Sequence, residues 1–289
     1  MEPAPSAGLT PAAIARYIQA AVLGGLLVIA FWPILTSMYG SWFDEKLYME
    51  HGILVIPAAA YMTWMKREKL QRIPVRPSIW GLGLLLLGAL LATLGIAAHW
   101  IWVGRMAFLV SLVGFILALF GARMVKELAY PLFTLIFMIA PPSFVYERIT
   151  MSLQLLASRV GEACLELMGY SVVREGNILE MVGTKMSIEE ACSGLRSLLS
   201  ITFMCTLYNY FFVNGNSMKV FILFMSVPVA ILGNIFRIVA SGVASQYDKN
   251  LLQGEWHDAF GYVSIVIAGI GCILVHYSAL KIQKKLRVA

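Results

Sequence analysis

Residues 148–170, RITMSLQLLASRVGEACLELMGY, decide how many times this chain crosses a membrane. The stretch is long enough for one span, since about 20 helical residues cover a hydrocarbon core of ~30 Å. Five of its polar side chains, however, share one sector of roughly 80° when wound at about 100° per residue; they are Arg148, Ser152, Arg159, Glu162 and Glu166. A helix with such a stripe lies along the membrane surface or lines a polar cavity. We therefore expect an amphipathic helix that does not cross.

The composition around this stretch is that of an integral membrane protein. Of 289 residues, 60% are hydrophobic and 13% are charged, whereas soluble domains have about a quarter charged residues. The net charge of +6 comes from basic residues beside apolar runs, where they set topology rather than bind phosphates, so no nucleic acid partner is expected. The four cysteines lack the spacing of a zinc site or of a disulfide framework.

Eight apolar runs are long enough to span the membrane. They cover residues 14–38, 47–65, 79–98, 101–122, 127–144, 190–213, 218–241 and 258–280. The sequence thus predicts an all-α polytopic membrane protein of about eight transmembrane helices. A flexible tail, 1–13, precedes a single membrane domain, 14–289.

Basic residues predict which ends face the cytoplasm. The loop KREKLQRIPVR, 66–76, and the tail KIQKKLR, 281–287, are both strongly basic, and Arg123 and Lys126 lie at a third junction on the same side. We count the membrane spans forward from the basic loop and backward from the basic tail. Both counts place the segment between them on the same side of the membrane only if the amphipathic helix does not cross. The insertion 145–189 is then extracytoplasmic.

The rest of this insertion predicts a short β-hairpin followed by a helix start. In GYSVVREGNILEMVGTKMSIEE, 169–190, apolar and β-branched residues flank a Gly-Asn pair, which is a hairpin signal. Ser187 with Glu190 three residues later matches a capping box, so a helix is expected to begin at Ile188. Cys192 would then lie just beyond the first turn, at the outer membrane boundary.

Two polar residues end the seventh apolar run on the same helix face. In LGNIFRIVASG, 232–242, Asn234 and Arg237 are three residues apart. Arg237 lies roughly 27 Å along a helix from Lys219, which is nearly the full hydrocarbon thickness. We therefore place Arg237 at the outer edge of the membrane.

A histidine just before the eighth run is expected at the same level. His257 lies roughly 36 Å of helix from Lys281 at the basic end. Cys192, Arg237 and His257 would thus share one layer although they come from three helices. A thiol, an imidazole and a guanidinium together predict acyl transfer: the thiolate attacks a carbonyl, His257 moves protons and Arg237 stabilises the oxyanion.

Three motifs carry a resemblance to a known family. EEACSGLRS, 189–197, GNIFRI, 233–238, and HDAFGY, 257–262, resemble in order and spacing the signature motifs of the exosortase/archaeosortase family. The resemblance covers about the last half of the chain. It implies a sortase-like site of Cys192, Arg237 and His257 on the outer face of the inner membrane, with no metal or organic cofactor.

The same resemblance implies the partners. The substrates would be exported proteins that end in a sorting signal, namely a motif such as Pro-Glu-Pro, a membrane helix and a basic tail. The enzyme would cleave at the motif, and a lipid or glycan would be the acceptor if the new C-terminus is transferred. Residues expected to support catalysis or bind substrate in the motif region, 187–261, are Arg196, Asn234, Ser193 and Glu190.

Other assignments remain open at this level. Arg237 alone fits an interfacial anchor that reaches the headgroups, and His51 and His99 are alternative bases near the outer boundary. A transporter would use Arg237, Arg196 and Glu190 to line a solute path. A non-catalytic assembly subunit would tolerate loss of Cys192.

Overall fold

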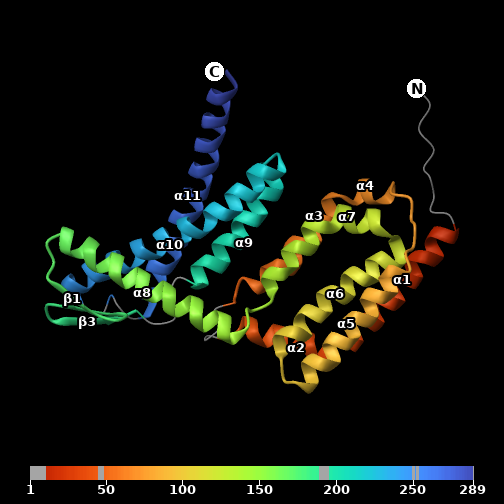
Figure 1. Cartoon of the computed structure of the whole chain (residues 1–289), viewed down its shortest axis with the longest axis horizontal. Coiled ribbons are helices and arrows are strands. Elements are labelled where there is room, and N and C mark those ends of the chain that lie inside the picture. Colours follow the sequence, from red (N-terminus) through yellow and green to blue (C-terminus); the bar gives the residue numbers. More distant parts are fainter. Residues whose placement is uncertain (1–10, 45–48, 189–194, 249–250, 252–253, 289) are drawn as a thin grey trace. The chain divides into compact units, whose positions relative to one another are not determined.

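The fold is described from a computed structural model that covers residues 11–44, 49–188, 195–248, 251 and 254–288. The described chain is mostly helical and has one small sheet (Figure 1). It divides into two compact units. Unit 1 contains residues 1–43 and 52–139, and unit 2 contains residues 44–51 and 140–289.

Unit 1 is built from seven α-helices and one 3-10 turn among the residues described. They are α1 (Pro11–Ala30), α2 (Trp32–Trp42), α3 (Gly52–Met65), α4 (Arg67–Gln71), α5 (Trp80–Ala97), α6 (Ile101–Phe120), α7 (Ala122–Thr134) and η1 (Leu135–Met138). Helices α1 and α2 are bent by 67° at Phe31. Pro33 explains the break, because it lies in the first turn of α2 and has no backbone N–H to continue α1.

Helices α5 and α6 form a tight antiparallel hairpin. The buried residues of α5 are Gly81, Gly88 and Gly95, which repeat every seven residues and so lie along one stripe. A Cβ atom built on Gly95 would lie only 2.7 Å from the backbone nitrogen of Gly104 in α6. The backbones therefore approach closely, as at membrane helix interfaces made by small residues.

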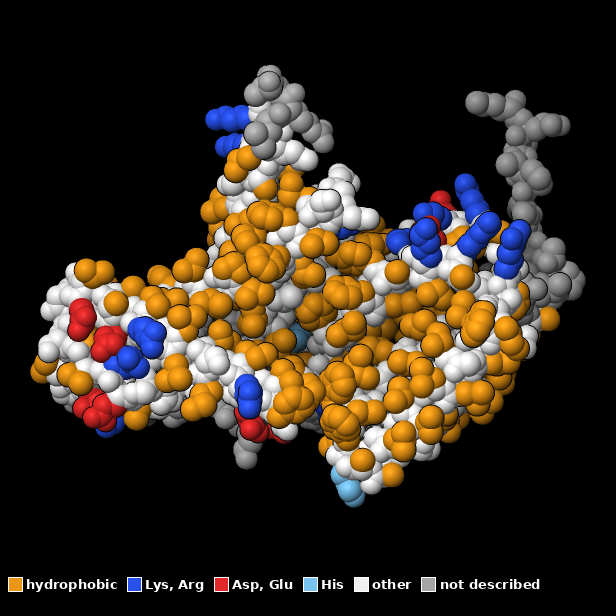
Figure 2. All heavy atoms as spheres, in the orientation of Figure 1, with side chains coloured by type: hydrophobic (Ala, Val, Ile, Leu, Met, Phe, Trp, Pro, Cys, Tyr) orange, Lys and Arg blue, Asp and Glu red, His pale blue; other side chains and the backbone are white. Residues whose placement is uncertain are grey.

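One end of unit 1 is basic. In Figure 2, Lys and Arg side chains gather over α4 and the chain beside it, while hydrophobic side chains cover the helices below. Lys69 pairs with Glu127 of α7 at 2.8 Å, and the backbone N–H of Arg76 donates to the carbonyl of Phe120. The basic loop 66–76 and the junction before α7 thus lie at the same end, as the sequence predicts.

Unit 2 contains α8 (Ser143–Leu167), a three-stranded sheet and three long helices. The strands are β1 (Val172–Glu175), β2 (Ile178–Met181) and β3 (Thr184–Ser187), and the helices are α9 (Leu195–Phe212), α10 (Asn216–Tyr247) and α11 (Gly254–Val288). Helix α10 packs against α8, α9 and α11. The helices of this unit carry the candidate site.

The predicted hairpin is present, and a third strand extends it. The strand order is β1-β2-β3, antiparallel, with Glu175 opposite Ile178 across the Gly176-Asn177 turn. Gly176 has φ +64° and Gly183, in the second turn, has φ +74°, which glycine adopts without strain. Every second strand residue faces inward onto α8 and α10; the buried cluster contains Val172, Leu179, Met181, Met186, Leu165 and Ile238.

The predicted helix start at Ile188 is wrong. Ser187 belongs to β3, and the backbone N–H of Ile188 donates to the carbonyl of Asn177 at 2.9 Å. The amide of Asn177 in turn donates to the carbonyl of Ile188 at 3.1 Å. Strand pairing therefore continues where the capping box predicted a helix, because paired backbone groups outweigh a single side-chain cap.

The count of spans is smaller than expected among the residues described. Four helices are long and apolar enough to cross a membrane, and six spans result if each of two bent helix pairs is one span. Helices α5, α6, α10 and α11 match the predicted runs 79–98, 101–122, 218–241 and 258–280. The total of eight, the non-crossing amphipathic helix and the single domain 14–289 stay predictions, as does the flexible tail 1–13, most of which lies outside the described residues.

Candidate active site

The candidate residues fall on three helices of unit 2. Arg196 lies in the first turn of α9, Asn234 and Arg237 on α10, and His257 in the first turn of α11. His257 is therefore inside a helix that begins at Gly254, not before it, and its side chain falls outside the described part of the chain.

The remaining candidates belong to a segment that the structure leaves out. Cys192, Ser193 and Glu190 lie within residues 189–194, which are not among the residues described. The described chain stops at Ile188 and resumes at Leu195, the first residue of α9. Of the first motif, 189–197, the structure therefore describes Leu195, Arg196 and Ser197, and Arg196 is the charged residue among these three.

Arg237 is buried rather than exposed at a helix end. It is 4% exposed, and Asn234, one turn before it, is 2% exposed. The guanidinium group packs directly on Gly261 of α11: a Cβ atom built on Gly261 would lie 3.3 Å from Cζ and from Nη2 of Arg237. Glycine at position 261 therefore makes room for the cation. This burial does not fit an anchor that reaches the lipid headgroups.

Arg196 and Arg237 line the same pocket. Its walls also include Ser197, Gly261, Tyr262 and Ile265, so α9, α10 and α11 all contribute. The pocket has a volume of about 20 Å³, which is room for about one water molecule. Two guanidinium groups at so small a cavity suit a carbonyl oxygen that becomes negative, or a substrate carboxylate.

Glu50 holds Arg196. Nη2 of Arg196 donates to Oε1 of Glu50 at 2.6 Å and also contacts Oε2. The Arg196 side chain is 22% exposed, and a charge-assisted pair fixes a guanidinium better than a neutral hydrogen bond does. The sequence gives no signal for this contact, since Glu50 belongs to no motif and lies 146 residues before its partner.

His51, an alternative base, lies along the same face of α9. Its Nδ1 is 3.4 Å from the hydroxyl of Ser200, and its ring lies 5.9 Å from the ring of Phe203. Ser200 and Phe203 follow Arg196 by one and two helical turns. Glu50 and His51 therefore attach this segment to the first three turns of α9.

The other two histidines are not among the residues that line this pocket. His99 is in the turn between α5 and α6 of unit 1, with φ +53°. His276 is in the C-terminal half of α11. A 2.7 Å hydrogen bond joins its Nδ1 to the hydroxyl of Tyr208. In the part of the chain that is described, no group of three or more His, Cys, Asp or Glu residues could hold a metal ion.

One comparison with known proteins found a match. A family model for transmembrane exosortases matches residues 42–274, which includes α2 to α11 in part or in full. No curated protein and no solved structure matches the chain. With its long apolar helices, the chain is a multi-pass membrane protein. Since the match covers well over half of the sequence, the chain belongs to the transmembrane exosortase family.

Proposed function

We propose that this protein is a membrane cysteine protease or transpeptidase that cleaves the C-terminal sorting signals of exported proteins. Family membership supports a membrane enzyme that processes sorting signals and has exported proteins as substrates. The single observation that carries the proposal is the pocket lined by Arg196, Arg237 and Gly261. Arg196, which lines the pocket, lies at the start of α9. It follows the motif cysteine, Cys192, by four residues in the sequence.

In the proposed reaction, the Cys192 thiolate attacks the scissile carbonyl carbon and forms a tetrahedral oxyanion. Arg237 stabilises this negative charge, for which a buried guanidinium with fixed geometry is suited. When the C–N bond breaks, His257 as imidazolium gives its proton to the leaving amine, and a thioester remains on Cys192.

The thioester is then resolved by water or by an acceptor nucleophile. His257, now neutral, takes the proton of the incoming nucleophile, and Arg237 again stabilises the oxyanion. Collapse of this second intermediate returns the Cys192 thiolate beside His257, which is again an imidazolium, and releases the new C-terminus as an acid or as a conjugate. Arg196, held by Glu50, would orient the substrate chain.

Substrate trapping tests the covalent step. The probe is a secreted reporter that ends in Pro-Glu-Pro, an apolar span of about 20 residues and a basic tail. Mass spectrometry of enzyme trapped with this reporter should find a hydroxylamine-labile adduct on the peptide containing Cys192. Cys192→Ser should insert normally but leave the reporter uncut, since a serine hydroxyl has almost no alkoxide at neutral pH.

Two further results separate the proposal from its alternatives. His257→Ala should slow both formation and breakdown of the adduct, because one imidazole serves both steps. Normal maturation of the reporter by Cys192→Ala would refute the enzyme assignment. A transporter or a non-catalytic assembly subunit would then account better for the chain.

A further inference from the structure

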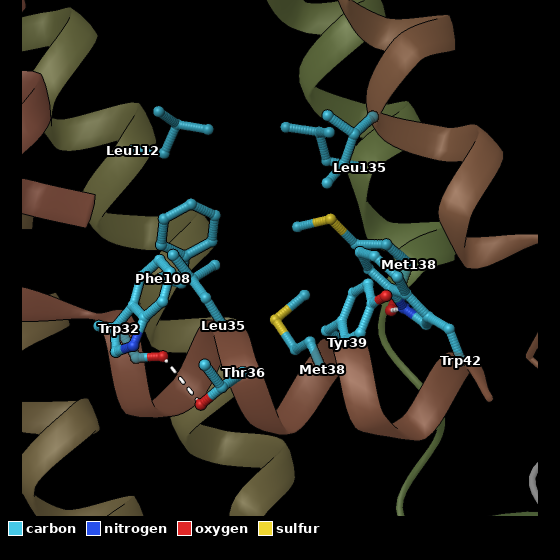
Figure 3. Close-up of a pocket in the computed structure, with 11 residues that line it drawn as sticks. Trp32, Leu35, Thr36, Met38, Tyr39, Trp42, Phe108, Leu112, Leu135 and Met138 are labelled. Carbon is cyan, nitrogen blue, oxygen red and sulfur yellow. Dashed lines mark hydrogen bonds between the residues drawn. The ribbon is translucent and has the colours of Figure 1, made fainter. Parts of the chain in front are cut away.

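Unit 1 contains an apolar pocket that the proposed reaction does not use. It has a volume of about 580 Å³, within the range of ~300–1,000 Å³ typical of small-molecule sites. Figure 3 shows side chains of α2, α6 and η1 pointing into it from opposite walls. The apolar lining includes Leu35, Met38, Trp42, Phe108, Leu112 and Leu135.

Two polar groups in this wall already have partners. The hydroxyl of Thr36 donates to the carbonyls of Trp32 and Pro33 at 3.1 and 2.9 Å. The indole N–H of Trp42 donates to the carbonyl of Met138 at 2.9 Å. Because these two groups are satisfied within the protein and most other lining residues are apolar, the part of a ligand that fills the pocket should be a hydrocarbon.

A buried cation lies beside the pocket. Arg105 is 8% exposed within α6, and its Nη2 donates to the carbonyl of Ser37 at 2.8 Å. Its Nε is buried and, among the residues described, has no hydrogen-bond partner. No described carboxylate pairs with this guanidinium either. A charge inside a membrane helix is costly, and it marks a functional site unless another group compensates it.

Arg105 lies on the same face of α6 as two residues of the pocket lining. Arg105, Phe108 and Leu112 are spaced by three and four residues, so they lie along one stripe of α6. Leu112 is about 10 Å along the axis from Arg105. Ser37, whose carbonyl binds Arg105, lies between the pocket residues Thr36 and Met38. Arg105 therefore lies next to this apolar pocket, one turn of α6 before Phe108, although it is not itself part of the lining.

We propose that unit 1 binds one molecule of an anionic phospholipid, with its phosphate at Arg105 and one acyl chain in the pocket. The phosphate supplies the missing counter-charge, and guanidinium groups bind phosphate oxygens strongly. The pocket lies beside α6, a candidate membrane span, at the depth where lipid chains are the solvent. A spanning peptide helix, about 10 Å wide and 30 Å long, is several times larger than the pocket.

Arg105 also has the position of a headgroup site. It lies in the second turn of α6, whose other end, Phe120, meets the basic loop 66–76. The lipid would thus belong to the leaflet opposite the basic end of unit 1. This proposal does not depend on the catalytic one.

Native mass spectrometry of the purified full-length protein tests the site. The protein is released from nanodiscs that contain equal amounts of phosphatidylglycerol and phosphatidylcholine. We expect one retained phosphatidylglycerol per chain in preference to phosphatidylcholine. Arg105→Gln should lower this retention by about tenfold or more, because a charged hydrogen bond is lost. Arg123→Gln removes an exposed arginine at the start of α7 and should leave retention unchanged.

A second variant tests the pocket without touching the charge. Leu112→Trp fills the cavity from the α6 wall and should lower retention of phosphatidylglycerol by a similar factor while Arg105 remains. Equal retention of both lipids, or unchanged retention in Arg105→Gln and Leu112→Trp, would overturn the proposal. Displacement of the lipid by inorganic phosphate alone would overturn the acyl-chain assignment. Preferential retention of an added polyprenyl phosphate over phosphatidylglycerol would overturn the assignment to a phospholipid.

Discussion

Replacing Gly261 by alanine should slow processing of the reporter without destabilising the protein. The new Cβ atom would lie 3.3 Å from Cζ and Nη2 of Arg237 and 3.5 Å from Nη1. Carbon atoms prefer to be about 3.5–4.0 Å from their neighbours. The guanidinium group must therefore retreat by a few tenths of an ångström from the pocket that it lines.

The expected loss of rate follows from this displacement. A misplacement of about 1 Å in an active site can reduce rate ~100-fold, so a few tenths should cost several-fold for Gly261→Ala. Gly261→Val places further atoms against the cation and should approach ~100-fold. The loss in Gly261→Ala should not come from unfolding, because alanine is more favourable than glycine in a helix interior by about 1 kcal/mol.

Gly269 provides the matched control. It lies two turns further along α11, and nothing lies within 4 Å of a Cβ atom built on it. Gly269→Ala and Gly269→Val carry the same changes in helix propensity but should process the reporter at the normal rate. The assay is the rate of reporter cleavage in membranes, with the melting temperature of each purified variant beside it. Wild-type rates in both Gly261 variants would refute a role for Arg237 at this pocket.

Three further tests address the arginines and the topology. Arg237→Lys should reduce the cleavage rate about 100- to 1,000-fold, as loss of an oxyanion donor does, whereas Arg196→Lys should be milder; equal rates in both would remove the difference in their roles. Glu50→Gln keeps the shape of its side chain but weakens the hold on Arg196, so we expect a raised KM with kcat nearly unchanged, and a changed kcat alone would contradict a positioning role. Val182→Cys, in the exposed turn between β2 and β3, should react with an impermeant thiol reagent from outside intact cells, while Arg72→Cys in the basic loop should react only after the cytoplasm is opened. The reverse pattern would contradict the proposed sidedness.

The hydropathy of the sequence correctly predicted the helices that are formed by uninterrupted apolar runs. Helices α5, α6, α10 and α11 coincide with predicted runs because twenty apolar residues have few alternatives in a bilayer. The run 14–38 instead forms two helices, since a single proline, Pro33, changes the backbone without changing the mean hydropathy. The run 47–65 yields a helix only from Gly52 to Met65. Local backbone breaks are thus the part of the fold that a hydropathy window misses.

The insertion shows how neighbouring signals compete. The Gly-Asn pair predicted the first turn correctly, because glycine accepts the positive φ that the turn requires. The Val182-Gly183 turn was missed, and with it β3. Once β3 pairs with β2, Ile188 extends the pairing through its bond to Asn177 and is not the first residue of a helix. The capping motif predicted a helix from its own few residues, but the pairing of β3 with β2 determines the structure at this position.

Within the site, residues on one helix were easier to predict than contacts between distant segments. The spacing of Asn234 and Arg237 predicted a shared face of α10, and both side chains are buried there. Gly261, on which Arg237 packs, lies within the third motif, 257–262. Glu50 was missed because its pairing with Arg196 depends on how the chain folds over 146 residues, and no spacing rule reaches that far.

The glycine stripe of α5 has a consequence for how the protein enters the membrane. Gly81, Gly88 and Gly95 place the α5 backbone against α6, and only residues 98–100 separate the two helices. This contact requires no side chain from any other helix, and close backbone packing holds helices together within lipid. The pair therefore can leave the translocation machinery as a preformed hairpin. Residues 78–121 would then be an early insertion unit, complete before the helices that carry the motifs have been synthesised.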